Sequence, residues 1–149
     1  MTAQRPDLLD LEVQVCFGLV AASRRVVALY RPLLEPMGLT HPLYLLMLAL
    51  WQHGRLPLHR LAELVHQDPA TVSPMVKKLE SLGYVSRRRD PADERALSIE
   101  LTDRGRELRR SAEAIPVTMM ERLGLGEDEL ARLRVVLDDL IDRSLTVPD

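Results

Sequence analysis

The stretch that decides the fold, residues 56–102, reads LPLHRLAELVHQDPATVSPMVKKLESLGYVSRRRDPADERALSIELT. Apolar residues recur at helical spacing over 58–65, which predicts a first helix. Asp68 then stands at an N-cap position and Pro69 at a first helical position, so a second helix is predicted over 69–82. Two short helices joined by a tight turn are typical of a helix-turn-helix.

A β-hairpin is predicted directly after the second helix. Gly83 ends that helix, because glycine readily adopts the left-handed conformation found at helix C-termini. Residues 84–85 and 97–101 predict two short strands, whereas 87–95 is too polar for a core and is predicted to be a loop, in which Asp90-Pro91 favours a turn. The expected fold is mainly α with a small β-hairpin wing.

Both parts of this winged helix-turn-helix carry side chains suited to DNA. Short hydroxyls near the start of a helix, with lysines further along, fit the major groove, and arginines on a hairpin can reach phosphates or the minor groove. The alternative is that both are ordinary solvated surfaces. The candidate DNA-binding residues are Thr71, Ser73, Pro74, Lys77 and Lys78 on the helix, and Arg87, Arg88, Arg89, Asp93 and Arg95 on the hairpin, where Asp93 is expected to pair with Arg95 and aim it.

The charge distribution favours contact with DNA at one place. The formal net charge of the 149 residues is only −2, so the total does not indicate a nucleic-acid partner. Residues 77–89 hold five basic residues against one acid, whereas 121–149 hold eight acids against four arginines. A basic middle and an acidic end are expected of a chain that binds double-stranded DNA through its central module.

The segments on either side of the module predict long amphipathic helices. A helix is expected over 7–31, ended near Pro32, and a nearly all-apolar helix over 41–53 must be buried on most sides. After the hairpin, a helix capped by Thr102 is expected to run to about residue 122 with a bend at Pro116. The last helix is expected over 127–145.

These outer helices suggest a homodimer. We expect one domain over 1–149, with a helical dimerisation region formed by 1–37 and 103–149 and a DNA-binding region over 55–102. A two-fold dimer presents two such modules to a palindromic operator. The alternative is that the outer helices pack only on their own chain.

The cysteine and histidine content restricts the chemistry. A single cysteine excludes an intrachain disulfide and a cysteine-rich zinc site, and His53, His59 and His66 have no nearby acidic or cysteine cluster, so neither a metal nor a cofactor is expected. Residues 1–10 lack the apolar core of a secretion signal, and no apolar run approaches the roughly 20 residues of a membrane span. A cytoplasmic protein without a membrane partner is predicted.

The sequence resembles the MarR family of winged helix-turn-helix regulators over essentially its whole length. Residues 71–80, TVSPMVKKLE, are similar to that family's recognition helix. Asp93-Glu94-Arg95, followed by Leu101-Thr102-Asp103-Arg104-Gly105, resembles its wing and the exit into the next helix. The resemblance implies a DNA-binding transcriptional regulator and not an enzyme.

A narrower resemblance is to the OhrR-like regulators, which sense organic hydroperoxides. It rests on Val15-Cys16-Phe17, on residues 30–36 (YRPLLEP) and on residues 39–44 (LTHPLY). In that branch a cysteine near the start of the first helix senses the oxidant, and tyrosines of the neighbouring subunit hydrogen-bond to its thiolate. The resemblance implies that Cys16 is the sensor and that Tyr30 supports it. The branch often has tyrosine where this chain has Val20 and His41, and His41 is a candidate supporting residue that could equally face solvent at a helix start.

Helix geometry does not allow Cys16 and Tyr30 to meet within one chain. Cys16 and Tyr30 are fourteen residues apart on one predicted helix, which is roughly 21 Å at 1.5 Å per residue. They can meet only between two antiparallel helices of a dimer. The expected chemistry is oxidation of the Cys16 thiolate by a peroxide to a sulfenic acid, followed by a mixed disulfide with a small cellular thiol or by overoxidation.

Three other functions remain open from the residues. Cys16 could be an inert buried cysteine in a repressor that responds to a small phenolic or lipophilic effector. A thiol-dependent peroxidase is less expected, because the chain shows no Cys-x-x-Cys, no glycine-rich phosphate loop and no nucleophile–base pair. A protein-interaction module without DNA binding is disfavoured by the hydroxyl–lysine helix.

Overall fold

The computed structural model describes residues 6–90 and 92–148, apart from the side chains at 90 and 93–96, and divides into two compact units. The first unit extends to Ala112 and the second begins at Glu113. In chain order the first contains η1 (Leu11–Val13), α1 (Val15–Leu34), η2 (Glu35–Met37), α2 (His41–His53), β1 (Leu56–Pro57), α3 (Leu58–Leu64), α4 (Pro69–Ser81), β2 (Val85–Asp90), β3 (Asp93–Leu101) and α5 (Asp103–Ala112); the second contains α6 (Ile115–Leu123) and α7 (Glu127–Leu145).

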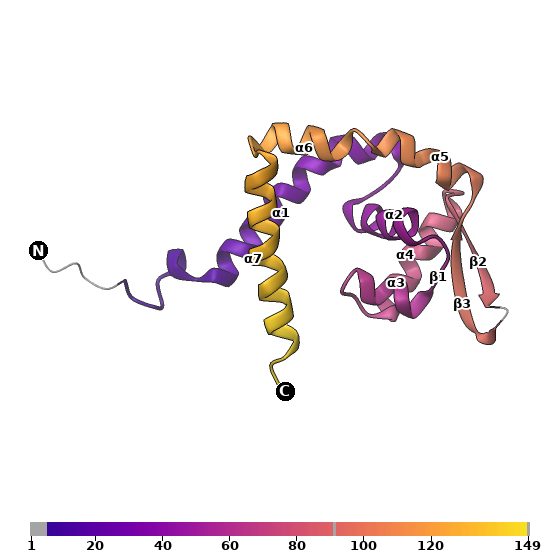
Figure 1. The fold of residues 1–149 in the computed structure, drawn as a ribbon, viewed down its shortest axis with the longest axis horizontal. Coiled ribbons are helices and arrows are strands. Elements are labelled where there is room, and N and C mark those ends of the chain that lie inside the picture. Colours follow the sequence, from indigo (N-terminus) through magenta and orange to yellow (C-terminus); the bar gives the residue numbers. More distant parts are fainter. Residues whose placement is uncertain (1–5, 91, 149) are drawn as a thin grey trace, which may run out of the picture. The chain divides into compact units, whose positions relative to one another are not determined.

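The core of the first unit forms around α2, which packs against α3 and α4 (Figure 1). Its apolar side chains are buried on most sides, as the sequence predicted. The expected fold class, mainly α with a β-hairpin wing, is confirmed. The fully buried side chains of this core are Leu34 of α1, Leu46, Met47 and Leu50 of α2, Leu61 of α3, Val72, Val76 and Leu79 of α4, Val85 of β2, and Ile99 of β3.

The sheet has three antiparallel strands in the order β1-β3-β2. The two-residue strand β1, which the sequence did not suggest, pairs Leu56 with Ile99. Strand β2 is therefore an edge strand that pairs only with β3, from Val85 opposite Leu101 to Arg89 opposite Leu97. The predicted loop over 87–95 was wrong for most of its length, because β2 and β3 extend the hairpin through the arginines.

Two helix boundaries also differ from the prediction. The first helix begins at Val15 rather than at residue 7, and it runs through Pro32 to Leu34. The predicted helix with a bend at Pro116 is instead two helices, of which α6 begins at Ile115 with Pro116 in its first turn, where proline is well tolerated. The second helix, His41–His53, and the last, Glu127–Leu145, lie where the sequence placed them.

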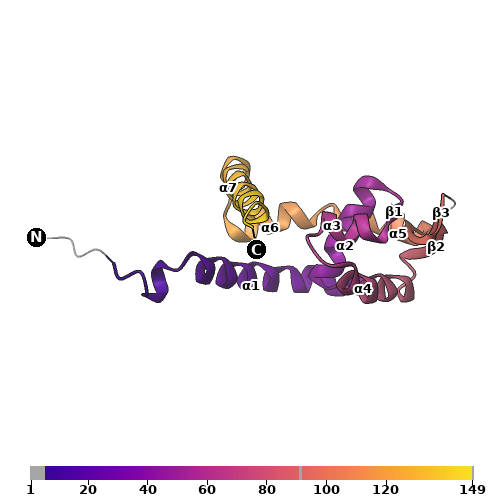
Figure 2. The ribbon, with the colours of Figure 1, turned by 90° about the horizontal axis from the view of Figure 1, so that it is seen from below.

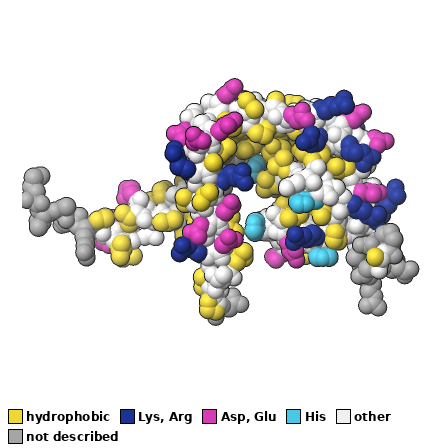
Figure 3. All heavy atoms as spheres, in the orientation of Figure 1, with side chains coloured by type: hydrophobic (Ala, Val, Ile, Leu, Met, Phe, Trp, Pro, Cys, Tyr) yellow, Lys and Arg dark blue, Asp and Glu magenta, His cyan; other side chains and the backbone are white. Residues whose placement is uncertain are grey.

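Apolar side chains at the start of α1 are exposed in the single chain. Figures 1 and 2 show α1 extending away from the cluster of α2, α3 and α4, and Figure 3 shows hydrophobic side chains along its outer end. The exposed apolar residues of this segment are Leu8, Leu9, Leu11, Val13, Val15, Phe17, Leu19 and Val20.

The second unit has a similar property. Its helix α7 has no buried residue, although it carries apolar side chains at heptad-like spacing. Gly126 precedes α7, and its amide donates a hydrogen bond of 2.9 Å to the Glu129 carboxylate in the first turn. The exposed apolar residues of α7 include Leu133, Val136, Leu140 and Ile141.

Within residues 6–90 and 92–148, no single helix has the length and apolar character to cross a bilayer. Val15–Met37 and His41–His53 meet the criterion only together, as a pair bent by 71°.

Candidate nucleic-acid interface and thiol site

Helix α4 separates its apolar and polar side chains between two faces. Val72, Val76 and Leu79 are buried, which fixes the helix on the core. The predicted DNA-contacting side chains lie elsewhere on the helix: Thr71, Pro74, Lys77 and Lys78 are exposed and Ser73 is half-buried. The side chain of Asp68, the residue at the N-cap, makes no capping hydrogen bond, and its carbonyl instead accepts from the amides of Thr71 and Val72. The exposed surface of α4 therefore offers hydroxyls at one end and two ammonium groups further along.

The three arginines of β2 lie in different surroundings. Arg87 forms a bidentate ion pair with Glu80 in the last turn of α4, with N–O distances of 3.1 and 3.2 Å. Arg88 is exposed and pairs with Glu100 of β3 at 2.8 Å. Arg89 is exposed near the hairpin tip. Among the contacts of the described residues, Arg87 is the one of the three that reaches back to α4.

Two further residues predicted to bind DNA, Asp93 and Arg95, belong to strand β3. Their side chains lie outside the described part of the structure, so the expected Asp93–Arg95 pair stays a prediction.

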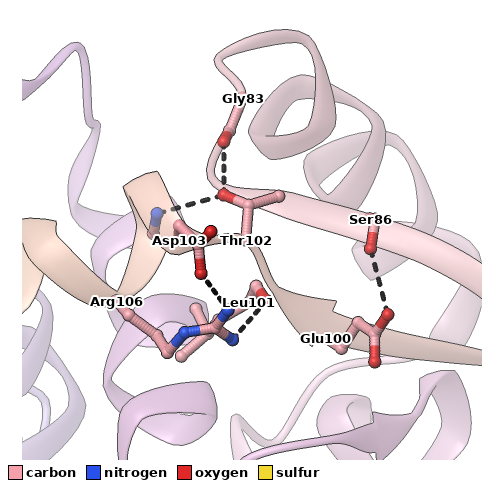
Figure 4. Close-up of polar contacts among 8 residues, drawn as sticks. Gly83, Ser86, Glu100, Leu101, Thr102, Asp103 and Arg106 are labelled. Atoms are coloured by element: carbon pink, nitrogen blue, oxygen red, sulfur yellow. Dashed lines mark hydrogen bonds and ion pairs between the residues drawn. The ribbon is translucent and has the colours of Figure 1, made fainter.

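The exit from the wing into α5 is fixed by Thr102, which caps that helix as predicted. Its hydroxyl donates to the Gly83 carbonyl at 2.6 Å and accepts from the Gly105 amide at 3.1 Å (Figure 4). The Thr102 amide donates to the Tyr84 carbonyl at 3.0 Å. Gly83 has φ of +81°, the left-handed conformation expected at the end of α4. One threonine therefore joins the end of α4 to the start of α5.

Position 105 requires glycine, because the junction leaves no space for a Cβ atom. A Cβ added there would lie 2.0 Å from the Tyr84 carbonyl oxygen. The Gly105 carbonyl in turn accepts a hydrogen bond of 2.9 Å from the indole N–H of Trp51 in α2. The Tyr84 hydroxyl donates to the Met37 carbonyl at 2.6 Å and is buried. These contacts hold the wing, α5 and the core together. The hydrogen bonds of Trp51 and Tyr84 were not predicted, because no local sequence pattern indicates them.

The single cysteine lies in the first turn of α1 and is exposed. Val15, Phe17 and Val20 around it are also exposed. The alternative in which Cys16 is buried does not hold for the single chain, because its helix face is not covered within the first unit. The reactivity of the thiol stays a prediction. A thiol in this position is open to a peroxide or to a second protein surface.

Tyr30 and His41, the predicted supporting residues, contact each other at the other end of α1. Their ring centroids are 4.8 Å apart, and the ring of Tyr44 lies 5.9 Å from Tyr30 and 6.3 Å from His41. Burial raises the pKa of Tyr30 and lowers that of His41, so the phenol stays protonated and the imidazole neutral. Burial raises the pKa of Tyr44, and repulsion between its phenolate and an ionised Tyr30 raises it further.

Tyr44 was missed as a member of this group because it reads as one more apolar residue of a buried helix. Its spacing of three from His41 was the available signal, since residues three apart lie on one helix face. The fourteen residues between Cys16 and Tyr30 on continuous helix correspond to roughly 21 Å, so one chain does not bring them together.

A cavity of about 470 Å³ opens beside the aromatic group. Apolar side chains of α1 and the following turn form much of its wall, and Arg24, Arg31 and Glu35 provide charge. His41 also lines it, so a ligand there would contact the same imidazole that lies against Tyr30. The described residues contain no cluster of His, Cys, Asp and Glu able to hold a metal ion.

Known proteins of one family share this architecture. The model of the MarR family matches residues 39–97. The organic hydroperoxide resistance transcriptional regulator of Bacillus subtilis (strain 168) is 36% identical over 136 residues, which are 91% of this chain and 92% of that protein. The structure of AbfR of Staphylococcus epidermidis is 30% identical, with a TM-score of 0.78 over 92% of this chain and 95% of that one. Reduced AbfR bound to DNA gives a TM-score of 0.76 at 30% identity, over 91% of this chain and 92% of that one.

Proposed function

Because this chain belongs to the MarR family of transcriptional regulators, we propose that it is a dimeric repressor that leaves its operator when an organic hydroperoxide oxidises Cys16. The observation that carries the proposal is the exposed, solitary thiol at the start of α1, on a segment whose apolar side chains are uncovered in the single chain. The relative from Bacillus subtilis is named for organic hydroperoxide resistance, which gives the oxidant its chemical class.

DNA binding is assigned to α4 and the wing. The exposed Thr71 hydroxyl, the half-buried Ser73 hydroxyl and the exposed lysines of α4 suit base edges and phosphates of the major groove. Arg88 and Arg89 lie on the hairpin that would follow the DNA backbone. A related protein, AbfR, has been solved bound to DNA in its reduced form. We expect the protein to act on a palindromic site in the cytoplasm, with one module of the dimer on each half.

Dimerisation would cover the two exposed apolar surfaces. A helix such as α7, with apolar side chains at heptad-like spacing and none buried, can bury those side chains only against a further surface. The segment over 8–20, which includes the start of α1, has the same need, because eight of its apolar residues are exposed. An antiparallel meeting of two α1 helices would bring Cys16 to the partner subunit's Tyr30 and to the neighbouring His41.

The proposed reaction begins when the Cys16 thiolate attacks one oxygen of the hydroperoxide. The O–O bond breaks, sulfur is oxidised to a sulfenic acid, and the alkoxide leaves and takes up a proton to become the alcohol. A small cellular thiol then attacks the sulfenic sulfur, expels water and forms a mixed disulfide. This product adds polar bulk to a packed apolar surface, which would change the spacing of the two DNA-binding modules.

The first experiment is a DNA-shift titration of the wild type and Cys16→Ser, each with and without tert-butyl hydroperoxide and glutathione. Both proteins should bind the operator when reduced, and only the wild type should release it on oxidation. Release of the Cys16→Ser variant by the peroxide would overturn the sensor role of Cys16. Steady peroxide consumption with excess thiol would instead indicate an enzyme.

Mixed dimers test whether the site is shared between subunits. Pairing a Cys16→Ser subunit with a Tyr30→Phe subunit keeps one cysteine opposite one intact tyrosine, so oxidation at the wild-type rate is expected at that site. The matched control pairs a wild-type subunit with one that carries both substitutions, and its only cysteine faces phenylalanine. Equal oxidation rates in the two mixed dimers would refute the shared site.

The cavity beside His41 supports a second candidate function. Its volume of about 470 Å³ lies in the range of small-molecule sites, and it combines apolar walls with two arginines. A repressor that binds a small phenolic or lipophilic effector there would need no chemistry at Cys16. Release of Cys16→Ser from DNA by a phenolic compound, and not by a hydroperoxide, would favour this function.

A further inference from the structure

Glu80 and Arg87 connect the last turn of α4 to the wing. The guanidinium donates to both carboxylate oxygens, from Nε at 3.2 Å and from Nη2 at 3.1 Å. This is the two-point geometry in which arginine and a carboxylate bind each other best. The exposed fractions of the two side chains are 30% for Arg87 and 38% for Glu80, so solvent reaches the pair only in part.

The backbone of Arg87 takes part as well. Its amide donates to the same Glu80 carboxylate at 3.2 Å. Strand β2 is an edge strand, so every second amide along it points away from β3 and lacks a partner strand. Glu80 therefore holds the wing through a side chain and through a backbone group that the sheet leaves open.

Arg87 differs in this respect from its neighbours in sequence. Arg88 pairs with Glu100 across the hairpin, so its ion pair stays within the wing. Among the ion pairs of the described residues, Glu80–Arg87 is the one that links α4 to the wing. The hydrogen bonds to Glu80 raise the pKa of Arg87 and lower that of Glu80, so both charges persist over the physiological range.

We propose that the Glu80–Arg87 pair positions the wing against the recognition helix, and that Arg87 contributes to operator selection through Glu80 instead of through a phosphate. This inference rests on the proposed function, in which α4 and the wing bind the same duplex. A fixed angle between the two allows base contacts by α4 and backbone contacts by the wing to form in one register. With the pair broken, the wing still meets phosphates, but its register relative to α4 is no longer set.

The proposal predicts that both partners act in the same direction on operator preference. Glu80→Gln removes a negative charge near DNA and Arg87→Gln removes a positive one, so simple electrostatics would shift general affinity in opposite directions. A positioning role instead predicts that each lowers the preference for operator over random duplex by roughly three- to thirtyfold, and that the double variant loses no more than either single one. The exchanged pair, Glu80→Arg with Arg87→Glu, should restore part of the preference.

The salt dependence separates positioning from phosphate contact. Affinity is measured by fluorescence anisotropy at several salt concentrations, on a duplex selected by the wild type from a random pool. Arg89→Gln, the matched control on the same strand, should reduce the slope of log K against log salt by about 1. Arg87→Gln should leave the slope at its wild-type value. A slope lowered by about 1 in Arg87→Gln, with unchanged preference in Glu80→Gln, would overturn the proposal.

A measurement without DNA tests the Glu80–Arg87 contact independently of the proposed function. Hydrogen exchange of the Arg87 amide is followed by NMR in the free protein. Glu80→Ala should accelerate that exchange, whereas Glu63→Ala, which breaks the exposed Arg60–Glu63 pair of α3, should not. Unchanged exchange in Glu80→Ala would refute the pair itself. If the wild type shows no preference for any duplex but Glu80→Ala still accelerates the exchange, the DNA-binding function is refuted and the Glu80–Arg87 pair is confirmed.

Discussion

The substitution Gly105→Ala tests the junction between the wing and α5. The new Cβ would lie 2.0 Å from the Tyr84 carbonyl oxygen, 3.0 Å from its carbon and 3.2 Å from Leu101 Cδ2. Real Cβ atoms essentially never come closer than 3.0 Å to such atoms, so the backbone must move by about 1 Å. Overpacking of this kind costs about 1–3 kcal/mol, and we expect about 3 kcal/mol because the obstacle is backbone that cannot rotate away.

Thermal unfolding followed by circular dichroism measures this cost. A loss of about 3 kcal/mol should lower Tm by roughly 6–12 °C for a chain of this size. The control is Gly126→Ala, whose Cβ would meet only the Glu129 carboxylate at 3.8 Å. It should lose about 0.5–1 kcal/mol, the preference for glycine over alanine at an N-cap. Equal Tm values for the two variants would refute the steric argument, and operator affinity should fall only in Gly105→Ala.

Three further predictions each concern one side chain. Tyr84→Phe leaves the Met37 carbonyl without its buried donor and should cost about 1–2 kcal/mol in urea unfolding, whereas an unchanged midpoint would show that water replaces the hydroxyl. Burial lowers the pKa of His41, so the unfolded chain binds more protons below about pH 6.5 and the wild type loses stability as pH falls through that window. His41→Gln should flatten this dependence, and urea midpoints that keep the wild-type slope would assign it to another group. Lys78→Gln should weaken DNA binding equally across sequences and lower the salt slope by about 1, and a sequence-dependent loss would indicate base contact instead.

The helix-turn-helix was predictable because its signals are local. Asp68-Pro69 and Gly83 delimit α4 within a residue, and the apolar spacing between them identifies its buried face. Helix α2 was equally clear, since thirteen nearly all-apolar residues between Thr40 and Gly54 have no other stable environment. In both cases the residues that determine the structure lie within the helix or directly at its ends.

The wing was less predictable because strand pairing supplies what composition lacks. Arg87, Arg88 and Arg89 read as a loop, yet an edge strand can expose polar side chains while β3 satisfies its backbone. The Glu80–Arg87 pair depends on how the turn at Gly83 folds β2 back along α4. The number of charged residues in the sequence does not indicate that direction.

The candidate thiol site was predicted in part. Resemblance supplied Cys16, Tyr30 and His41, and the structure places the last two in contact. Tyr44 lies beside His41 on one face of α2, and it meets Tyr30 because α1 packs against α2. Whether Cys16 meets this group depends on a second subunit, so no property of one chain decides it.

Trp51, the only tryptophan of the chain, gives the protein an intrinsic optical probe. Its indole N–H donates to the Gly105 carbonyl in the first turn of α5, close to Thr102, which fixes the exit from the wing. Indole emission responds to the polarity and hydrogen bonding around the ring, so unlabelled protein carries its own signal at the point where wing and core meet. Stopped-flow fluorescence could therefore time a rearrangement at this junction against the dissociation of a dye-labelled duplex in the same mixing experiment.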